Sequence, residues 1–161
     1  MRLPRPLDAV EVRVLGSLLE KELLTPDVYP MTLQGLVAAC NQKTSREPVT
    51  ELSAVEVVAA LDRLRELVLA WKVTGGRADK WEHNLDAKWD LAKEEKALVA
   101  LLLLRGAQTA AELRARAERM HDLASVEAAE ELLRKMAAHA EPLVVELPRR
   151  PGQKETRWAH L

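Results

Sequence analysis

The chain has 161 residues, with 24 basic and 25 acidic side chains and one cysteine. This balance, which holds in both halves, excludes a strongly basic nucleic-acid module, and the single cysteine excludes an internal disulfide. No apolar run approaches the roughly 20 residues that span a bilayer, and the start of the chain lacks the apolar stretch of a signal peptide. We therefore expect a cytoplasmic protein without membrane contact.

The first quarter of the chain predicts two helices. Asp8 and Glu11 are spaced to cap a helix and to place a negative charge in its first turn, and this helix is expected to run to about Leu23. Apolar residues over 33–40 follow the i, i+3, i+4, i+7 spacing of a second helix with one buried side. Cys40 ends that stripe, so we interpret it as a small buried residue and not as a nucleophile.

A polar segment then leads to a third helix and a hairpin. Ser53 and Glu56 form the capping-box pattern, and the apolar side of this helix is expected to extend to Val68. Two short strands are predicted over residues 68–74 and 80–85, on either side of a Gly-Gly turn. Three helices followed by a two-stranded wing are typical of the winged-helix fold.

The second half of the chain repeats this order. A leucine-rich helix ends at Gly106, and Thr109 and Ser125 are placed to cap two further helices. A strand is predicted over residues 143–147, before a basic turn over 148–154. The connection after the first helix is shorter than in the first half.

The two halves also end alike. Trp81 and His83, which follow a basic residue, recur 77 residues later as Trp158 and His160. A period this long indicates a duplicated domain and not a solenoid unit. Because the tryptophans recur at equivalent strand positions, we expect both to pack the wing onto its helices.

These patterns together predict a mainly α fold with small β wings, built as two tandem winged-helix domains. The first domain is expected over residues 1–85 and the second over 91–161, with residues 86–90 as the linker. The linker is too short and too mixed in charge to act as a flexible tether.

Four segments carry a family resemblance. They are Leu-Leu-Thr-Pro-Asp-x-Tyr-Pro at 23–30, Ala-Cys-Asn-Gln-Lys-x-x-Arg-Glu-Pro-Val at 39–49, Leu-Leu-Arg-Gly-x-Gln-Thr at 103–109 and Glu-x-Arg-x-Ala-His at 155–160. Over nearly its whole length the chain resembles the YceH-like family of bacterial proteins. The resemblance implies a tandem winged-helix fold and a family without an assigned biochemical role.

The third helix of a DNA-binding winged helix enters the major groove, and the wing contacts the DNA backbone. Here that helix begins with an acid in each half, Glu56 and Glu127, which phosphates would repel. We therefore interpret the alternating charges of these helices as a solvated face. The basic residues around the wings are better candidates for binding nucleic acid, which we expect to be DNA bound in a regulatory role.

Nine basic residues form this candidate set. For both wings the alternative interpretation is a basic loop that only keeps the protein soluble, and we favour it for the first wing. Residues 41–48 either read bases or satisfy backbone groups, and we favour the structural role. The candidates are Lys72, Arg77 and Lys80 in the first wing, Arg149, Arg150, Lys154 and Arg157 in the second, and Lys43 and Arg46 before the third helix.

Protein–protein interaction is the competing function. Tandem winged helices of near-neutral charge serve as dimerisation and scaffold elements in chromosome-partition complexes, which is an analogy of fold only. Trp89 does not recur in the repeat and lies in the linker, so we expect it to join the two domains or to meet a partner. Homodimerisation stays open.

An enzyme is not expected. The chain has no phosphate loop, no Gly-x-Ser-x-Gly and no His-Glu-x-x-His, so nothing in it places a nucleophile, a base or a metal. Its four histidines are too scattered for a zinc-binding pattern. We therefore predict no cofactor and no metal.

Overall fold

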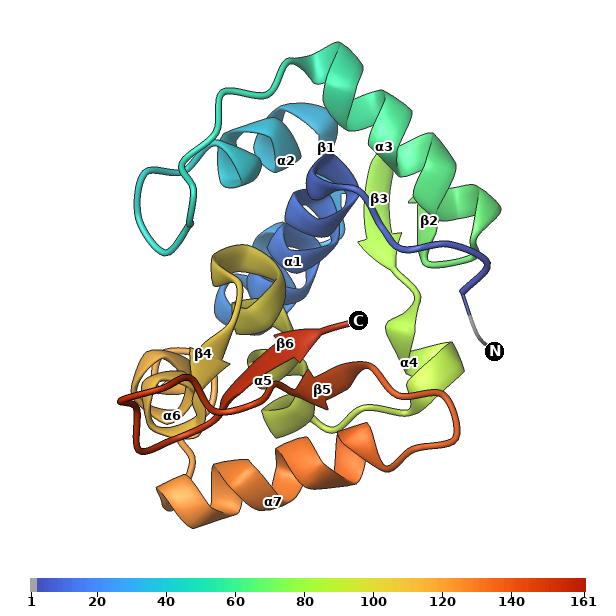
Figure 1. Ribbon diagram of the computed structural model, residues 1–161. Coiled ribbons are helices and arrows are strands. Elements are labelled where there is room, and N and C mark those ends of the chain that lie inside the picture. Colours follow the sequence, from blue (N-terminus) through green and yellow to red (C-terminus); the bar gives the residue numbers. More distant parts are fainter. Residues whose placement is uncertain (1–2) are drawn as a thin grey trace.

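The computed structural model describes residues 3–161, apart from the side chain of Lys88. Within these residues the chain is mainly helical and forms two three-stranded antiparallel sheets, one in each half (Figure 1). The predicted mainly α class with small β elements is confirmed. No helix in the described part combines the length and the apolar composition needed to cross a bilayer.

The two halves follow the same order of elements. The first half contains α1 (Ala9–Leu24), the 3-10 helix η1 (Pro26–Val28), β1 (Met31–Thr32), α2 (Leu33–Cys40), α3 (Ala54–Glu66), β2 (Ala70–Val73) and β3 (Lys80–His83). After α4 (Leu85–Trp89), the second half contains α5 (Lys93–Arg105), β4 (Gln108–Thr109), α6 (Ala110–Ala117), α7 (Val126–Ala137), β5 (Val144–Glu146) and β6 (Arg157–His160).

The helix starts lie where the capping patterns predict them. At α1 the Glu11 N–H donates to Asp8 Oδ1 at 2.8 Å, and the Asp8 N–H donates back to Glu11 Oε1 at 2.9 Å. Ser53 caps α3 and Thr109 caps α6 with the same reciprocal arrangement, and Ser125 caps α7. Each cap satisfies backbone donors that have no partner inside the helix.

The end of the third helix differs from the prediction. Helix α3 ends at Glu66, and Val68, expected on its buried side, has a φ of 60° and is 37% exposed. The chain reverses here, because the Leu69 N–H donates to the Leu64 carbonyl at 2.9 Å. Leu69 therefore takes the buried position, and the strand starts at Ala70.

Each hairpin gains a third strand that the sequence patterns did not predict. In the first half β1 pairs with β3, placing Met31 opposite Trp81, and the strand order is β1-β3-β2. The second half has the order β4-β6-β5, with Gln108 opposite Trp158. Both tryptophans are buried in the core, as predicted from their recurrence. We call β2–β3 the first hairpin and β5–β6 the second hairpin.

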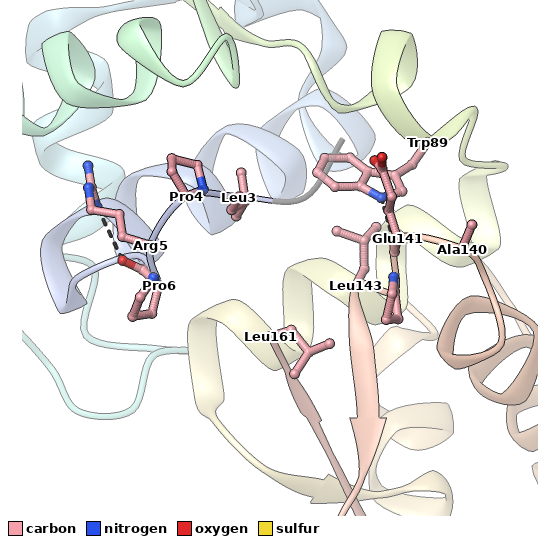
Figure 2. Close-up of a pocket in the computed structure, with 10 residues that line it drawn as sticks. Leu3, Pro4, Arg5, Pro6, Trp89, Ala140, Glu141, Leu143 and Leu161 are labelled. Atoms are coloured by element: carbon pink, nitrogen blue, oxygen red, sulfur yellow. Dashed lines mark hydrogen bonds between the residues drawn. The ribbon is translucent and has the colours of Figure 1, made fainter.

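The segment expected as a linker is mostly helical. Four of its five residues belong to α4, which starts at Leu85 and ends at Trp89. The buried Trp89 donates its indole N–H to the Glu141 carbonyl of the second half at 2.8 Å (Figure 2). Trp89 thus joins the two halves, which was one of its two expected roles.

Helices α1 and α5 form the centre of the molecule and pack against each other, while α3 and α7 lie at opposite outer sides (Figure 1). Gly16 of α1 allows this close approach. A Cβ at this position would lie 2.9 Å from the Leu104 side chain and 3.0 Å from Leu103 Cβ of α5. The missing side chain therefore lets the two halves share one core.

Candidate nucleic-acid interface

The second hairpin carries the largest group of candidate cations. Arg149, Arg150 and Lys154 are exposed in the turn after β5, and the half-buried Arg157 begins β6. None of the four forms an ion pair within 4 Å with a described acidic residue. Such guanidinium and ammonium groups can contact phosphate oxygens.

The backbone fixes the base of this turn. The Leu147 N–H donates to the Arg157 carbonyl at 2.7 Å, and the Thr156 hydroxyl donates to Glu146 Oε2 at 2.6 Å. Beside it lies a pocket of about 370 Å³ whose lining mixes both signs of charge. Its charged lining residues are Glu130, Arg134, Glu146, Arg149, Lys154 and Glu155.

The first hairpin offers fewer available cations. Lys72 pairs with Asp79 at 3.1 Å, and its ammonium lies 5.8 Å from the ring centroid of Trp81. Arg77 and Lys80 are exposed and form no ion pair with a described residue. Lys72 is therefore partly neutralised, whereas the other two cations stay available.

The outer helices do not present cations where DNA would meet their first turns. At the start of α3, Val55 is 79% exposed and Glu56 is bound to its capping partner Ser53. At the start of α7, Glu127 is exposed. An acidic or apolar first turn disfavours insertion into a groove lined by phosphates.

Arg46 is not available as a candidate, which corrects the sequence-based set. Its side chain is 0% exposed and binds Glu20, itself 1% exposed, through two hydrogen bonds of 2.8 and 2.9 Å. Its Nε–H also donates to the Ala39 carbonyl at 3.0 Å. Burial opposes ionisation of Glu20, but the hydrogen bonds and charge of Arg46 lower the pKa of that carboxyl. Lys43, in the same segment, is exposed.

The polar segment over residues 41–53, which we call the signature loop, is held in place by side chains from inside the protein. Arg13 of α1 donates to the Pro48 carbonyl at 2.6 Å and to the Cys40 carbonyl at 3.0 Å. The Asn41 side chain exchanges hydrogen bonds with the backbone of Leu52 at 2.7 and 2.9 Å. These side chains satisfy backbone groups, which is the favoured interpretation of the segment. Cys40 is fully buried, as expected, and burial raises the pKa of its thiol.

Besides the Glu20–Arg46 pair, which lies within the first half, another ionic group connects the first half with the second. Glu22, His83 and Asp86 lie close enough to be ligands of one metal ion. However, the Lys96 ammonium lies 3.0 Å from Glu22 Oε1 and 2.9 Å from Asp86 Oδ2, so it already serves as the shared counter-ion of both carboxylates. His83 Nδ1 accepts the Leu85 N–H at 3.2 Å, which places the ring proton on Nε2, 2.9 Å from Glu22. We interpret this group as a polar link between α1 and α5.

Three further arginines lie at the junction of the halves and were not singled out from the sequence. Arg105, at the end of α5, and Arg116 and Arg119, in and just after α6, line one pocket with Ser45 of the signature loop. Arg116 and Arg119 are close in the chain, but Arg119 lies in the turn after α6, so no helical spacing marked the two as a pair. Their proximity to Arg105 depends on the tertiary fold.

The pocket drawn in Figure 2 has a different character. It has a volume of about 600 Å³ and lies between the start of the chain and the second half. Leu3, Trp89, Leu143 and Leu161 contribute to a mainly apolar lining. None of the nine candidate cations lines it, so it is not part of the candidate interface.

Comparison with known sequences finds a matching family model and close relatives in bacteria. Residues 7–153 match the family model described as "Protein of unknown function, DUF480". The chain is 50% identical to a UPF0502 protein of Chromobacterium violaceum over 96% of its own length and 71% of that relative, and 48% identical to one of Paracidovorax citrulli over 98% and 69%. The resemblance to YceH-like proteins is thereby confirmed, and the chain belongs to the bacterial DUF480 family.

Proposed function

We propose that this protein is a cytoplasmic, non-enzymatic tandem winged-helix protein that binds DNA through phosphate contacts. In each half three helices precede an antiparallel hairpin, which is the order of a winged helix. The observation that carries the proposal is the second hairpin, where Arg149, Arg150 and Lys154 are exposed without ion-pair partners among the described residues. A turn with these cations supports backbone contacts of a wing.

The surface of the helices indicates the mode of binding. Because α3 and α7 lie at opposite sides (Figure 1) and both lack a cation in the first turn, base reading by these helices is not part of the proposal. Binding through the hairpins alone neutralises phosphates without selecting a sequence. The proposed activity is therefore salt-dependent binding with little sequence preference.

A salt titration of binding to random duplex DNA tests the proposal. Fluorescence anisotropy should show an affinity that falls steeply with salt, with a slope of log K against log salt of about −0.9 for each phosphate contact. Replacement of Arg149→Ala with Arg150→Ala should weaken the binding, whereas Arg65→Ala, at an exposed position on α3, should not. Absence of measurable binding at low salt would contradict the proposal.

A protein-interaction role, as a dimerisation or scaffold element, is the second candidate. It is favoured by two exposed valines: Val55 on α3 is 79% exposed, and Val49 in the loop before α3 is 51% exposed. A DNA-binding helix would carry polar groups at such positions. The occupant we expect is a second copy of the chain. Light scattering should then report a dimer that Val55→Asp dissociates, and a strictly monomeric wild-type protein would exclude this candidate.

A further inference from the structure

An arginine pocket of about 450 Å³ lies where the signature loop meets the second half. We define the arginine pocket by Arg105, Arg116, Arg119 and Ser45. Glu118 is the only carboxylate among its described lining residues. The four defining groups come from three separate segments, the loop after α2, the end of α5, and α6 with the residues that follow it.

The charge of the arginine pocket is only partly compensated. Arg105 forms no ion pair with a described residue, and its buried Nε has no hydrogen-bond partner. Burial, together with the charges of Arg116 and Arg119, lowers the pKa of Arg105, although Glu47 acts in the opposite direction. The guanidinium remains protonated at neutral pH, so the like charges repel one another.

The other two arginines have modest partners. Arg119 donates to the hydroxyl of Ser45 at 2.8 Å, which is neutral. Arg116 donates to Gln108 Oε1 at 2.6 Å and lies 3.4 Å from a carboxylate oxygen of Glu112 on the same helix. Glu112 is exposed to solvent, which screens this pair, and Glu112 together with Glu118 balances at most two of the three guanidinium charges. The array therefore retains a net positive charge of the kind that an anion stabilises.

We propose that the arginine pocket binds a phosphate-type oxyanion, either inorganic phosphate or the phosphoryl group of a small phosphate ester. Guanidinium groups pair with phosphate through parallel N–H donors, and a tetrahedral anion offers oxygens to three arginines and a hydroxyl at once. A planar carboxylate offers only two oxygens. The pocket is also larger than the anion alone, which leaves space for a small organic group.

The loop side of this pocket is preorganised by the buried ion pair. Ser45 has a φ of 57°, and its carbonyl accepts a hydrogen bond from Arg46 at 2.9 Å. The next peptide is tied to α5, because the Glu47 N–H donates to the Leu104 carbonyl at 3.0 Å. Two of the segments that carry the family resemblance thus meet at one pocket, which the proposed DNA contacts of the hairpins do not use.

The test compares sodium phosphate, glycerol phosphate, sodium acetate and sodium chloride at equal ionic strength. Calorimetric titration should give saturable binding of phosphate or glycerol phosphate and none of acetate. At tenfold excess over the dissociation constant, the melting temperature should rise by about 3–5 °C. Stronger binding of glycerol phosphate than of phosphate identifies an ester as the ligand, and equal binding identifies free phosphate.

Variants locate the binding. Arg105→Gln with Arg119→Gln should abolish the response and, by relieving repulsion, keep or raise the melting temperature in chloride. Arg119→Gln alone, at an exposed position, should weaken phosphate binding at least fivefold, and Arg65→Gln should leave it unchanged. The hairpin variant Arg149→Ala with Arg150→Ala should also respond normally, which separates this inference from DNA binding. Equal phosphate responses in wild type and both pocket variants, or no saturable response, would overturn it.

Discussion

The two halves share an order of elements but use their charged residues differently. Glu20 is the twelfth residue after the cap of α1 at Asp8 and is buried with Arg46. The matching residue of α5, twelve after the cap at Ala92, is the buried Leu104. The same place in the repeat is therefore filled by an ion pair in one half and by a leucine in the other.

The length of the loop after the second helix accounts for this difference. In the first half it covers residues 41–53 and is held by buried arginines, whereas in the second half it covers 118–125. The shorter loop needs only Arg114, which donates to the carbonyls of Leu123 and Ala124, both at 3.1 Å. The longer loop of the first half is thus stabilised by a buried ion pair, whereas the second half has no such pair at the matching place and carries the larger group of exposed cations in its hairpin.

Glu20→Ala should have the largest effect. It leaves the guanidinium of Arg46 buried without a counter-charge, so the free energy of unfolding should fall by about 3–5 kcal/mol. Urea denaturation measures this loss, and Glu51→Ala, at an exposed position, should change it by less than about 0.5 kcal/mol. Glu20→Leu with Arg46→Met imitates the second half and should recover most of the stability. A loss below about 1 kcal/mol for Glu20→Ala would show that the pair does not hold the loop.

Gly16→Val should be the next most destabilising change. Its side chain would enter the contact between α1 and α5, where Leu103 and Leu104 leave no room for even a Cβ. Overpacking of this kind costs about 1–3 kcal/mol. Gly76→Val, in the first hairpin turn, meets only one atom at 3.8 Å and is the matched control. If both variants unfold at the same urea concentration, the two halves do not share a tightly packed core.

The local signals in the sequence predicted the helix starts well. The caps at Asp8, Ser53 and Thr109 depend on residues three apart in the chain, so a sequence pattern contains the whole interaction. Strands β1 and β4 were missed because two residues are too few to show an alternating pattern.

The role of a basic residue could be predicted much less well than its presence. Arg46 looks like a surface cation in the sequence, and only the tertiary fold brings it to Glu20, 26 residues earlier. The arginine pocket depends on contact between Ser45 and Arg119, 74 residues apart. A single sequence contains no period or spacing that reports such contacts.

Acid should weaken the first half through the same ion pair, with a smaller effect than its removal. The pKa of Glu20 is lowered in the folded state from its ordinary value of 4.5, so the pair contributes fully above about pH 4.5 and its contribution is lost as the pH falls through the lowered value. Urea denaturation at a series of pH values between 6 and 2.5 measures this effect. As the pH falls, the free energy of unfolding should decrease more steeply for the wild type than for Glu20→Leu with Arg46→Met. If the free energy of unfolding depends on pH in the same way in both proteins, protonation of Glu20 does not contribute to acid unfolding.

The hairpins should give the smallest effect on stability and the clearest contrast in binding. Arg149→Ala with Arg150→Ala removes two exposed cations without described ion-pair partners, so the free energy of unfolding should change by less than about 0.5 kcal/mol. The slope of log K against log salt for duplex DNA should become shallower by up to about 2.

The matched change in the first hairpin is Lys72→Ala with Arg77→Ala. It should alter the salt slope less, because Asp79 already neutralises Lys72. Equal changes in slope would mean that the two hairpins contact DNA equally. The contrast between the halves would then be limited to the buried charges, since the surface cations would serve the same purpose in both.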